Sequence, residues 1–231
     1  RLALANITML EGDHASGISE VEAILNEKPD FLPALGVYYL AQTKQGEPEK
    51  AIEHAKRALA SSPDSMEIQS LLTRMYLAEE QWQNALDVVN GMAITQDSLP
   101  AYWVLKGQTL LRNNKLREAA DHYNQWIAFS PNNKQAVMGK LLLLDNDREF
   151  IEAQQLTEAF LAIRDDAQIN VLYTHFLTMN QAFDEARVLY ADMPDNLKEM
   201  PILKAVQARL KVSEKQYAEA LPFAQGAYEA V

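Results

Sequence analysis

Six consecutive residues, DHYNQW at 121–126, carry side chains of the types that most often take part in chemistry. Asp121 and His122 could exchange protons with a bound molecule, and the rings of Tyr123 and Trp126 could stack on one. Helical geometry favours another interpretation, because residues three positions apart share one face of a helix. Tyr123 and Trp126 are then expected on a buried face, and Asp121 and His122 toward the outer, solvated face. We therefore predict a structural segment with Trp126 in the core.

Other constellations that could support catalysis or metal binding are weak. No two of the four histidines lie three or four positions apart, and the sequence lacks HExxH, GxSxG and glycine-rich phosphate-loop motifs. The run DNDRE (145–149) lacks the glycine and the distal glutamate of a calcium loop, so a solvated turn is expected there. We predict no catalytic residue, no metal site and no cofactor, and hence a protein that is not an enzyme.

The composition restricts the kinds of partner. Of the 231 residues, 21 are Lys or Arg and 32 are Asp or Glu, which gives a formal net charge of −11. This charge repels nucleic-acid phosphates and anionic membrane surfaces, so neither is expected as a partner. Cysteine is absent, which excludes disulfides and thiolate zinc sites. No apolar run is long enough to cross a bilayer, so direct membrane insertion is not expected.

Small residues recur along the chain at a nearly constant interval. They are Gly17, Ala51, Ala85, Ala119, Ala153, Ala186 and Ala220, spaced 34 residues apart except for one step of 33. A bulky side chain stands three positions before most of them, and a proline follows several of them twelve positions later. A ladder of this kind indicates an internal repeat. Small residues are expected to recur where two helix backbones approach closely, because a larger side chain would overpack the contact.

The repeated unit resembles the tetratricopeptide repeat (TPR), a pair of antiparallel helices. The match is best over residues 100–133, where six residues stand at or near the family's signature places: Trp103, Gly107, Leu110, Ala119, Tyr123 and Pro131. The resemblance implies an all-α, right-handed superhelical solenoid of about thirteen or fourteen helices. It predicts one solenoid domain over residues 1–231, with units 1–31 (partial), 32–65, 66–99, 100–133, 134–166, 167–200 and 201–231 (partial).

Some features depart from a uniform array. His54 holds the same place in its repeat as His122 and is likewise expected on the outer face. Pro222 falls inside a predicted helix and should bend or interrupt it. The chain begins and ends within helical patterns, which suggests a piece of a longer array. No following helix would then cover the final helix, which ends in YEAV and carries Leu221, Phe223 and Ala224. We therefore expect weak self-association through exposed repeat ends.

The first helix of each unit lines a concave groove in the resembled family, which implies a binding surface here. The groove residues that we single out are Lys44, Arg74, Val104, Gln108, Arg112, Met138, Leu142, Val171, His175 and Arg209. The middle of this groove is apolar and its basic side chains outnumber the acidic ones. Such a surface suits a protein or peptide with an apolar anchor and some acidic character. The lysine and asparagine clamp by which some family members hold acidic chaperone tails is missing.

We expect a non-catalytic protein–protein interaction scaffold that binds a peptide or a helical segment. The alternative is a regulatory or substrate-recruiting module of a larger enzyme or of an envelope exopolysaccharide and exosortase system. The divergent tandem repeats also resemble those of bacterial TPR lipoproteins of exosortase (PEP-CTERM) systems. This resemblance would place the protein in the cell envelope or periplasm. An RNA-binding helical repeat is disfavoured by the period and by the acidic charge.

Overall fold

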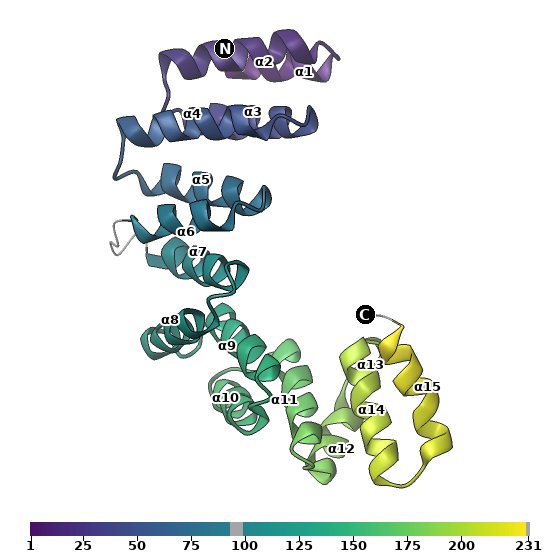
Figure 1. Ribbon diagram of the computed structural model, residues 1–231. Coiled ribbons are helices and arrows are strands. Elements are labelled where there is room, and N and C mark those ends of the chain that lie inside the picture. The colour runs from purple at the N-terminus through teal and green to yellow at the C-terminus, as the bar shows by residue number, and fades with distance from the viewer. Residues whose placement is uncertain (93–98, 230–231) are drawn as a thin grey trace. The chain divides into compact units, whose positions relative to one another are not determined.

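The computed structural model describes residues 1–92 and 99–229, and over these residues it is built of helices and connections, with no strand (Figure 1). The chain divides into two compact units, Arg1–His122 and Tyr123–Val231, and the division falls within one helix. Each unit is treated by itself. No helix among the described residues is both long and apolar enough to span a membrane.

The first unit consists of consecutive helices in which each packs against the next. They are α1 (Leu2–Leu10), α2 (His14–Glu27), α3 (Leu32–Lys44), α4 (Pro48–Ser61), α5 (Met66–Ala78), α6 (Trp82–Asn90) and α7 (Leu99–Arg112). Helix α8 (Leu116–Phe129) carries the division between the units. The part of the predicted repeat 66–99 that covers residues 93–98 lies outside the described residues.

The second unit continues with α9 (Lys134–Asn146), α10 (Phe150–Ile163), α11 (Ala167–Met179), α12 (Phe183–Asp192), α13 (Asp195–Lys198), α14 (Pro201–Ser213) and α15 (Tyr217–Tyr228). Two helices per repeat were predicted, and the described residues contain one element in addition to these pairs, the short helix α13. Prolines bracket it, since Pro194 precedes its first turn and Pro201 opens α14. The connection between them is long enough for a single helical turn.

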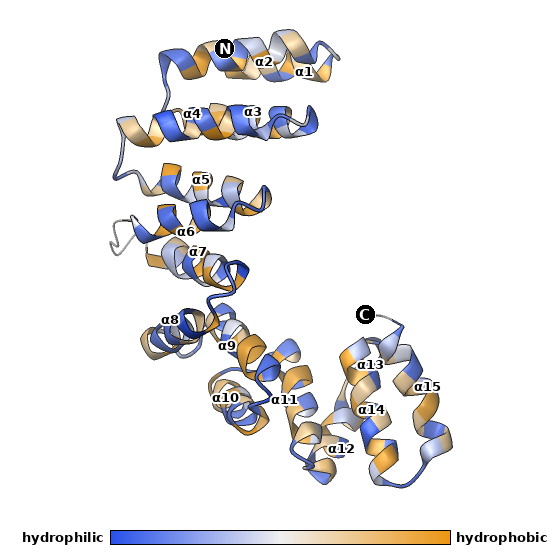
Figure 2. Ribbon diagram, in the orientation of Figure 1, coloured by the Kyte–Doolittle hydropathy of each residue, from blue (hydrophilic) through white to orange (hydrophobic). Residues whose placement is uncertain are grey.

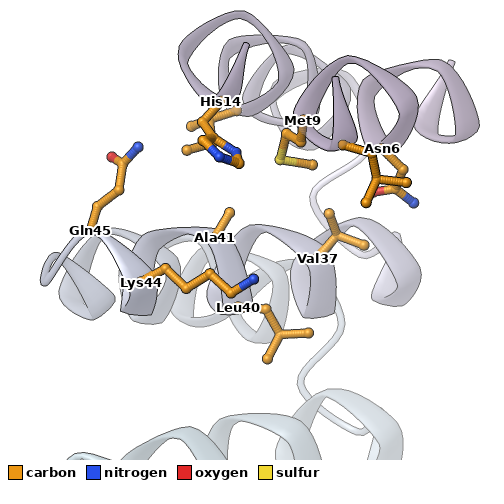
Figure 3. Close-up of a pocket in the computed structure, with 10 residues that line it drawn as sticks. Asn6, Met9, His14, Val37, Leu40, Ala41, Lys44 and Gln45 are labelled. Carbon is orange, nitrogen blue, oxygen red and sulfur yellow. The ribbon is translucent and has the colours of Figure 1, made fainter. Parts of the chain in front are cut away.

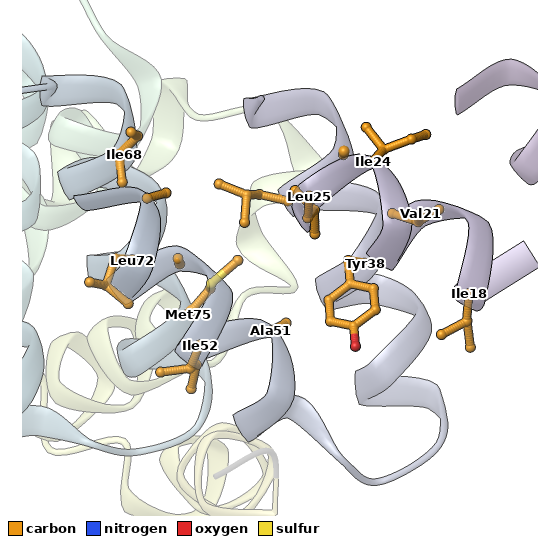
Figure 4. Packing of buried hydrophobic residues seen from close by; sticks show 14 of the residues in the cluster. Ile18, Val21, Ile24, Leu25, Tyr38, Ala51, Ile52, Ile68, Leu72 and Met75 are labelled. Atoms are coloured by element: carbon orange, nitrogen blue, oxygen red, sulfur yellow. The ribbon is translucent and has the colours of Figure 1, made fainter. Parts of the chain in front are cut away.

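A continuous apolar core joins helices α1 to α6 of the first unit (Figure 4). Leu25 of α2, Tyr38 of α3, and Leu72 and Met75 of α5 are each at most 1 % exposed. Because one cluster includes side chains from consecutive pairs, each pair buries the apolar face of its neighbour. Figure 2 shows the matching pattern, with hydrophobic and hydrophilic stretches alternating around the helices. The all-α solenoid of helical pairs is thus confirmed.

The periodic small residues lie where helices touch. All the alanines of the ladder are buried, with exposed fractions between 0 % and 5 %. At Gly17 a Cβ atom would lie 2.3 Å from Cγ of Met9 and 2.8 Å from the carbonyl oxygen of Ala5. Helices α1 and α2 therefore approach closely at this glycine, which is the reason that the sequence analysis gave for the ladder.

A second periodic feature is a left-handed backbone conformation in the turn inside each pair. Its members are Gly12, Gly46, Glu80, Asn114, Arg148, Gln181 and Lys215, with φ between 54° and 100°. They follow the same interval as the buried alanines, so every pair ends its first helix in the same way. Only two of them are glycine, the residue that adopts this conformation without steric cost.

Glycine at the other turns is expected to stabilise the protein. The left-handed conformation costs a residue with a side chain about 1–2 kcal/mol, whereas glycine loses about 0.5–1 kcal/mol more backbone entropy on folding. Glu80→Gly and Lys215→Gly should therefore each raise the free energy of unfolding by about 0.5–1 kcal/mol in urea titrations. Gly46→Ala is the reverse control, because its Cβ would meet no atom within 4 Å and only backbone strain is added. Loss of stability in both glycine variants would contradict this account.

Helix α15 runs through Pro222 without interruption, so of the two predicted effects of this proline the interruption is wrong and the bend stays a prediction. Along it Leu221 is 58 % exposed, Ala224 is exposed and Phe223 is partly buried. Ala230 and Val231 of the terminal YEAV lie outside the described residues. Self-association through the ends of the array stays a prediction.

Candidate functional site

The predicted groove residues are distributed over the first helices of the pairs in both units. The first unit holds Lys44 (α3), Arg74 (α5), and Val104, Gln108 and Arg112 (α7). The second holds Met138 and Leu142 (α9), Val171 and His175 (α11), and Arg209 (α14). The two halves are described separately, and one continuous groove stays a prediction.

Most of the predicted residues in the first unit are accessible. Lys44, Arg74, Gln108 and Arg112 are exposed, and Val104 is half-buried. The Arg112 guanidinium lies 5.4 Å from the centroid of the Trp82 ring, a cation–π contact that restrains it without removing its charge.

In the second unit the prediction for Val171 is wrong. Val171 is only 3 % exposed and belongs to a buried cluster that also contains Leu177 and Leu203. Its side chain fills the space between α11 and the following pair, so it cannot anchor a partner. Leu142, by contrast, is 59 % exposed, and Met138 is partly buried against the core.

A cavity of the first unit lies between the first pair and α3, at one end of the predicted groove (Figure 3). Its volume is about 530 Å³, within the range of small-molecule and side-chain pockets. It is lined by Asn6, Met9, Leu10, His14, Ile18, Val37, Leu40, Ala41, Lys44 and Gln45.

The shape of this cavity follows from short side chains opposite long ones. Figure 3 shows Met9 and His14 pointing from the first pair toward α3, where Ala41 and Val37 lie opposite them. Ala41 leaves the space that a longer side chain would fill. Gly17 brings α1 close to α2 at Met9, so the same close approach helps to position one wall.

The electrostatics of the cavity differ from those of the chain. Its lining contains Lys44 and His14 but no carboxylate, although the chain carries a net charge of −11. Within the described part of the chain Lys44 forms no ion pair. Beside it, Leu40 is 64 % exposed, a large apolar side chain left in contact with water. The cavity thus combines apolar walls with an available positive charge.

Only part of this site was predicted from the sequence. Lys44 was predicted, whereas Met9, His14, Val37 and Ala41 were not. The positions of Met9 and His14 in the repeat could have indicated them, because both residues flank the turn of the first pair, opposite α3. The prediction centred the groove on Val104 and Leu142 instead, because apolar character alone does not reveal where a hollow lies.

The prediction for DHYNQW is confirmed for Trp126 and wrong for His122. Trp126 is 4 % exposed and its ring stacks on Tyr123 with centroids 6.3 Å apart, whereas His122 is itself only 6 % exposed. The imidazole Nε2 of His122 lies 2.8 Å from the carbonyl oxygen of Trp103 on α7 and donates to it. Burial lowers the pKa of His122, which keeps the ring neutral.

His54 corrects the prediction in the same way. It is 5 % exposed and meets Tyr38 edge to face, with ring centroids 5.1 Å apart. Both histidines face the first helix of their own pair rather than solvent, and burial lowers the pKa of His54 as well. Their shared place in the repeat was the signal that pointed to a common structural role.

The acidic run 145–149 forms the expected turn. Helix α9 ends at Asn146, Arg148 has a φ of 61°, and Glu149 precedes α10. Among the described residues no group of three or more His, Cys, Asp or Glu side chains is arranged to hold a metal ion.

One polar cluster of the second unit includes two of the predicted groove residues. His175 on α11 lies between Asp145 at the end of α9 and Arg209 on α14. Its Nε2 is 3.5 Å from Oδ1 of Asp145, and its Nδ1 is 3.3 Å from NH1 of Arg209. Burial lowers the pKa of His175, and the nearby Arg209 charge lowers it further. The neutral ring therefore accepts a hydrogen bond from the guanidinium.

Comparison with known proteins supports the fold. Residues 44–125 match the family model described as anaphase-promoting complex, cyclosome, subunit 3. No curated protein matches the sequence. Among solved structures, a tetratricopeptide repeat protein from Parabacteroides merdae has 14 % identity and a TM-score of 0.59, covering 99 % of this chain and 91 % of that one.

Two further solved structures are similar over most of the chain. The Pseudomonas aeruginosa pilF protein has 17 % identity and a TM-score of 0.59, covering 90 % of this chain and 95 % of its own. PilW, described as a widely conserved type IV pilus biogenesis factor, has 16 % identity and a TM-score of 0.60, with coverages of 89 % and 96 %. At these identities the likeness concerns the fold.

Proposed function

We propose that this chain, a protein with the tetratricopeptide-repeat fold, is a non-catalytic scaffold that binds a peptide or helical segment of a partner protein. The observation that carries the proposal is the cavity between the first pair and α3. It offers apolar walls, the exposed Leu40 at its edge and the unpaired Lys44 within an acidic chain. Apolar pockets with a few polar groups are the usual form of a recognition site.

The proposed partner segment has one large apolar side chain with an acidic residue next to it. The apolar side chain would enter the cavity against Met9, Val37 and Ala41, and the carboxylate would face Lys44. Desolvation of the apolar anchor should supply most of the affinity, because a few buried central contacts dominate binding energies. The exposed lysine should act mainly on association rate and salt dependence.

Selection from a random peptide library on the immobilised chain tests the proposal. Wild-type protein should enrich sequences with an aromatic or large aliphatic residue beside Asp or Glu. Leu40→Asp, which places a negative charge at the edge of the cavity, and Ala41→Trp, which fills it, should weaken the enriched peptides at least tenfold, or about 1.4 kcal/mol. Lys44→Glu should shift the selection away from acidic residues.

Matched variants separate the cavity from general surface effects. Ile151→Asp changes an equally exposed apolar residue on α10, and Lys28→Glu changes an exposed lysine at the end of α2 that has no ion pair among the described residues. Both should bind the enriched peptides as the wild type does, and circular dichroism should show every variant folded. If Leu40→Asp and Ala41→Trp select the same peptides as the wild type, the proposed site is wrong.

The location of this activity is also a proposal. A place in the cell envelope is supported by the likeness to PilW, which is described as a pilus biogenesis factor. Fractionation of the source cells with an antibody against the chain would test it, and recovery in the cytoplasmic fraction alone would overturn it.

A further inference from the structure

Arg209 is a partly buried arginine of the second unit that has no carboxylate in direct contact among the described residues. It lies on α14 and is only partly exposed, and burial lowers the pKa of its guanidinium. Within the described residues no carboxylate oxygen lies within 4.0 Å of it, and its one side-chain hydrogen bond is to His175. A guanidinium in such a place is costly unless a negative charge compensates it.

The contrast with another arginine of the same unit shows what is missing. Arg187 on α12 is more exposed, yet it contacts Asp184 and Glu214 at 2.9 Å each. Arg209 has only Asp145 as a nearby carboxylate, and that carboxylate lies against Nε2 of His175 instead. Of these two arginines, the less exposed one therefore lacks a direct counter-charge among the described residues.

The histidine fixes the orientation of this arginine. Asp145 lies 3.5 Å from Nε2 of His175, which favours the tautomer with its proton on Nε2. Nδ1 then carries the lone pair that accepts from NH1 of Arg209. One N–H group of the guanidinium is engaged in this way, and among the described residues its other N–H groups have no side-chain partner.

We propose that Arg209 binds a carboxylate of a protein partner, with His175 and Asp145 as positioning residues. A carboxylate fits the planar donor fork in a two-point arrangement, and it neutralises the buried charge. The acidic chain and the neighbouring Asp145 disfavour a doubly charged phosphate. The site is separate from the cavity of the first unit and does not depend on it.

The surroundings of Arg209 also indicate what should stand beside the carboxylate. Arg209 lines a cavity of about 410 Å³ together with Phe183, Ala208 and Val212. These side chains provide an apolar wall along the aliphatic part of the arginine. A ligand with an apolar residue next to its carboxylate is therefore expected to bind better than an isolated carboxylate.

Titration of the whole chain with short peptides tests the proposal. With arginine side chains labelled with ¹⁵N, the peptide acetyl-Gly-Glu-Phe-Gly-amide should shift the Nε–Hε signal of Arg209 saturably, and the peptide with Gln in place of Glu should not. A third peptide, acetyl-Gly-Phe with a free carboxyl end, tells whether the site takes a side-chain or a terminal carboxylate. Saturable binding of either carboxylate supports the proposal, and binding of neither overturns it.

Variants assign the roles within the site. These variants lack the Arg209 signal, so binding is measured by calorimetry in the Leu40→Asp background, which weakens the first-unit site. There Arg209→Gln should weaken the better peptide at least tenfold, and Arg209→Lys should weaken it less, because lysine keeps the charge but not the fork. His175→Leu should weaken binding severalfold, whereas His175→Asn should retain it because the amide oxygen can replace Nδ1 as acceptor. Equal loss in both His175 variants would remove the positioning role.

Two controls keep this test independent of the proposed function. Arg164→Gln removes the same charge from an exposed residue at the end of α10 and should leave binding unchanged. Leu40→Asp weakens the first-unit cavity, where the same peptide could also bind, but it should leave the peptide-induced shift of the Arg209 Nε–Hε signal unchanged. Failure at one site can therefore be distinguished from failure at the other. If Arg209→Gln binds the peptide as the wild type does, Arg209 is not the recognition residue.

Discussion

Replacing Trp126 by alanine is expected to lower the free energy of unfolding by about 3–5 kcal/mol, the range for truncating a buried aromatic side chain. The indole is 4 % exposed and stacks on Tyr123, with an angle of 16° between the rings. Tyr123 in turn packs against Gly139, where a Cβ atom would lie 2.2 Å from its ring. The truncation would leave a cavity between α8 and α9 that the tightly placed Tyr123 cannot easily fill.

Urea titration followed by circular dichroism measures this loss. Gln125→Ala, at the neighbouring exposed position of α8, is the control and should change the stability by less than about 0.5 kcal/mol. A loss for Trp126→Ala that is no larger than that of the control would show that the indole is not part of the core.

The repeat made much of the fold predictable. A close approach of two helices tolerates only a small side chain, so the ladder from Gly17 to Ala220 reports helix contacts directly. The turn residues were harder to predict, because Glu80 and Lys215 adopt a left-handed conformation that their residue types disfavour. At these turns the packing of the helices imposes the backbone conformation against local preference.

The errors at single residues share a physical cause. The sequence defines the chemical type of each residue, whereas the burial of its side chain depends on which neighbouring residues face it. His122 is polar but turns toward α7, where the Trp103 carbonyl accepts a hydrogen bond from its ring, and Val171 occupies a groove place but is covered by the following pair. Neither residue type by itself shows that the side chain is buried, and an exposed side chain was therefore expected at both positions.

The candidate site was predictable in kind and only partly in place. The excess of basic over acidic groove residues pointed to Lys44, which lines the cavity between the first pair and α3, and binding by Lys44 stays a prediction. The cavity itself depends on the short Ala41 facing Met9 and His14, a relation between different helices. The link between Arg209 and His175 is also a relation between helices, because the two residues are a repeat apart in sequence and hydrogen-bonded in space.

Removing the imidazole of His122 is expected to lower the free energy of unfolding by about 2 kcal/mol at pH 8, and this is the second large effect on stability. About 1 kcal/mol comes from the lost hydrogen bond to the Trp103 carbonyl, and the rest from lost packing against the Trp103 and Tyr102 rings at 4.9 and 6.0 Å. His122→Ala measured in urea should show this loss, whereas His14→Ala, at an exposed histidine, should stay within about 0.5 kcal/mol.

The same histidine should make the stability depend on pH. Burial lowers the pKa of His122, so the unfolded chain, with a histidine pKa of about 6.5, binds the proton more readily than the folded one. The contribution of neutral His122 is therefore fully present above the unfolded value and is lost as the pH falls from about 6.5 toward the lower folded pKa. The pKa values of His54 and His175 are shifted in the same direction and add to the loss.

His122→Gln, which keeps a donor for the Trp103 carbonyl but does not titrate, should flatten the decline of unfolding free energy between pH 7 and pH 5. An unchanged slope in this variant would mean that His122 is protonated as easily in the folded chain as in the unfolded one.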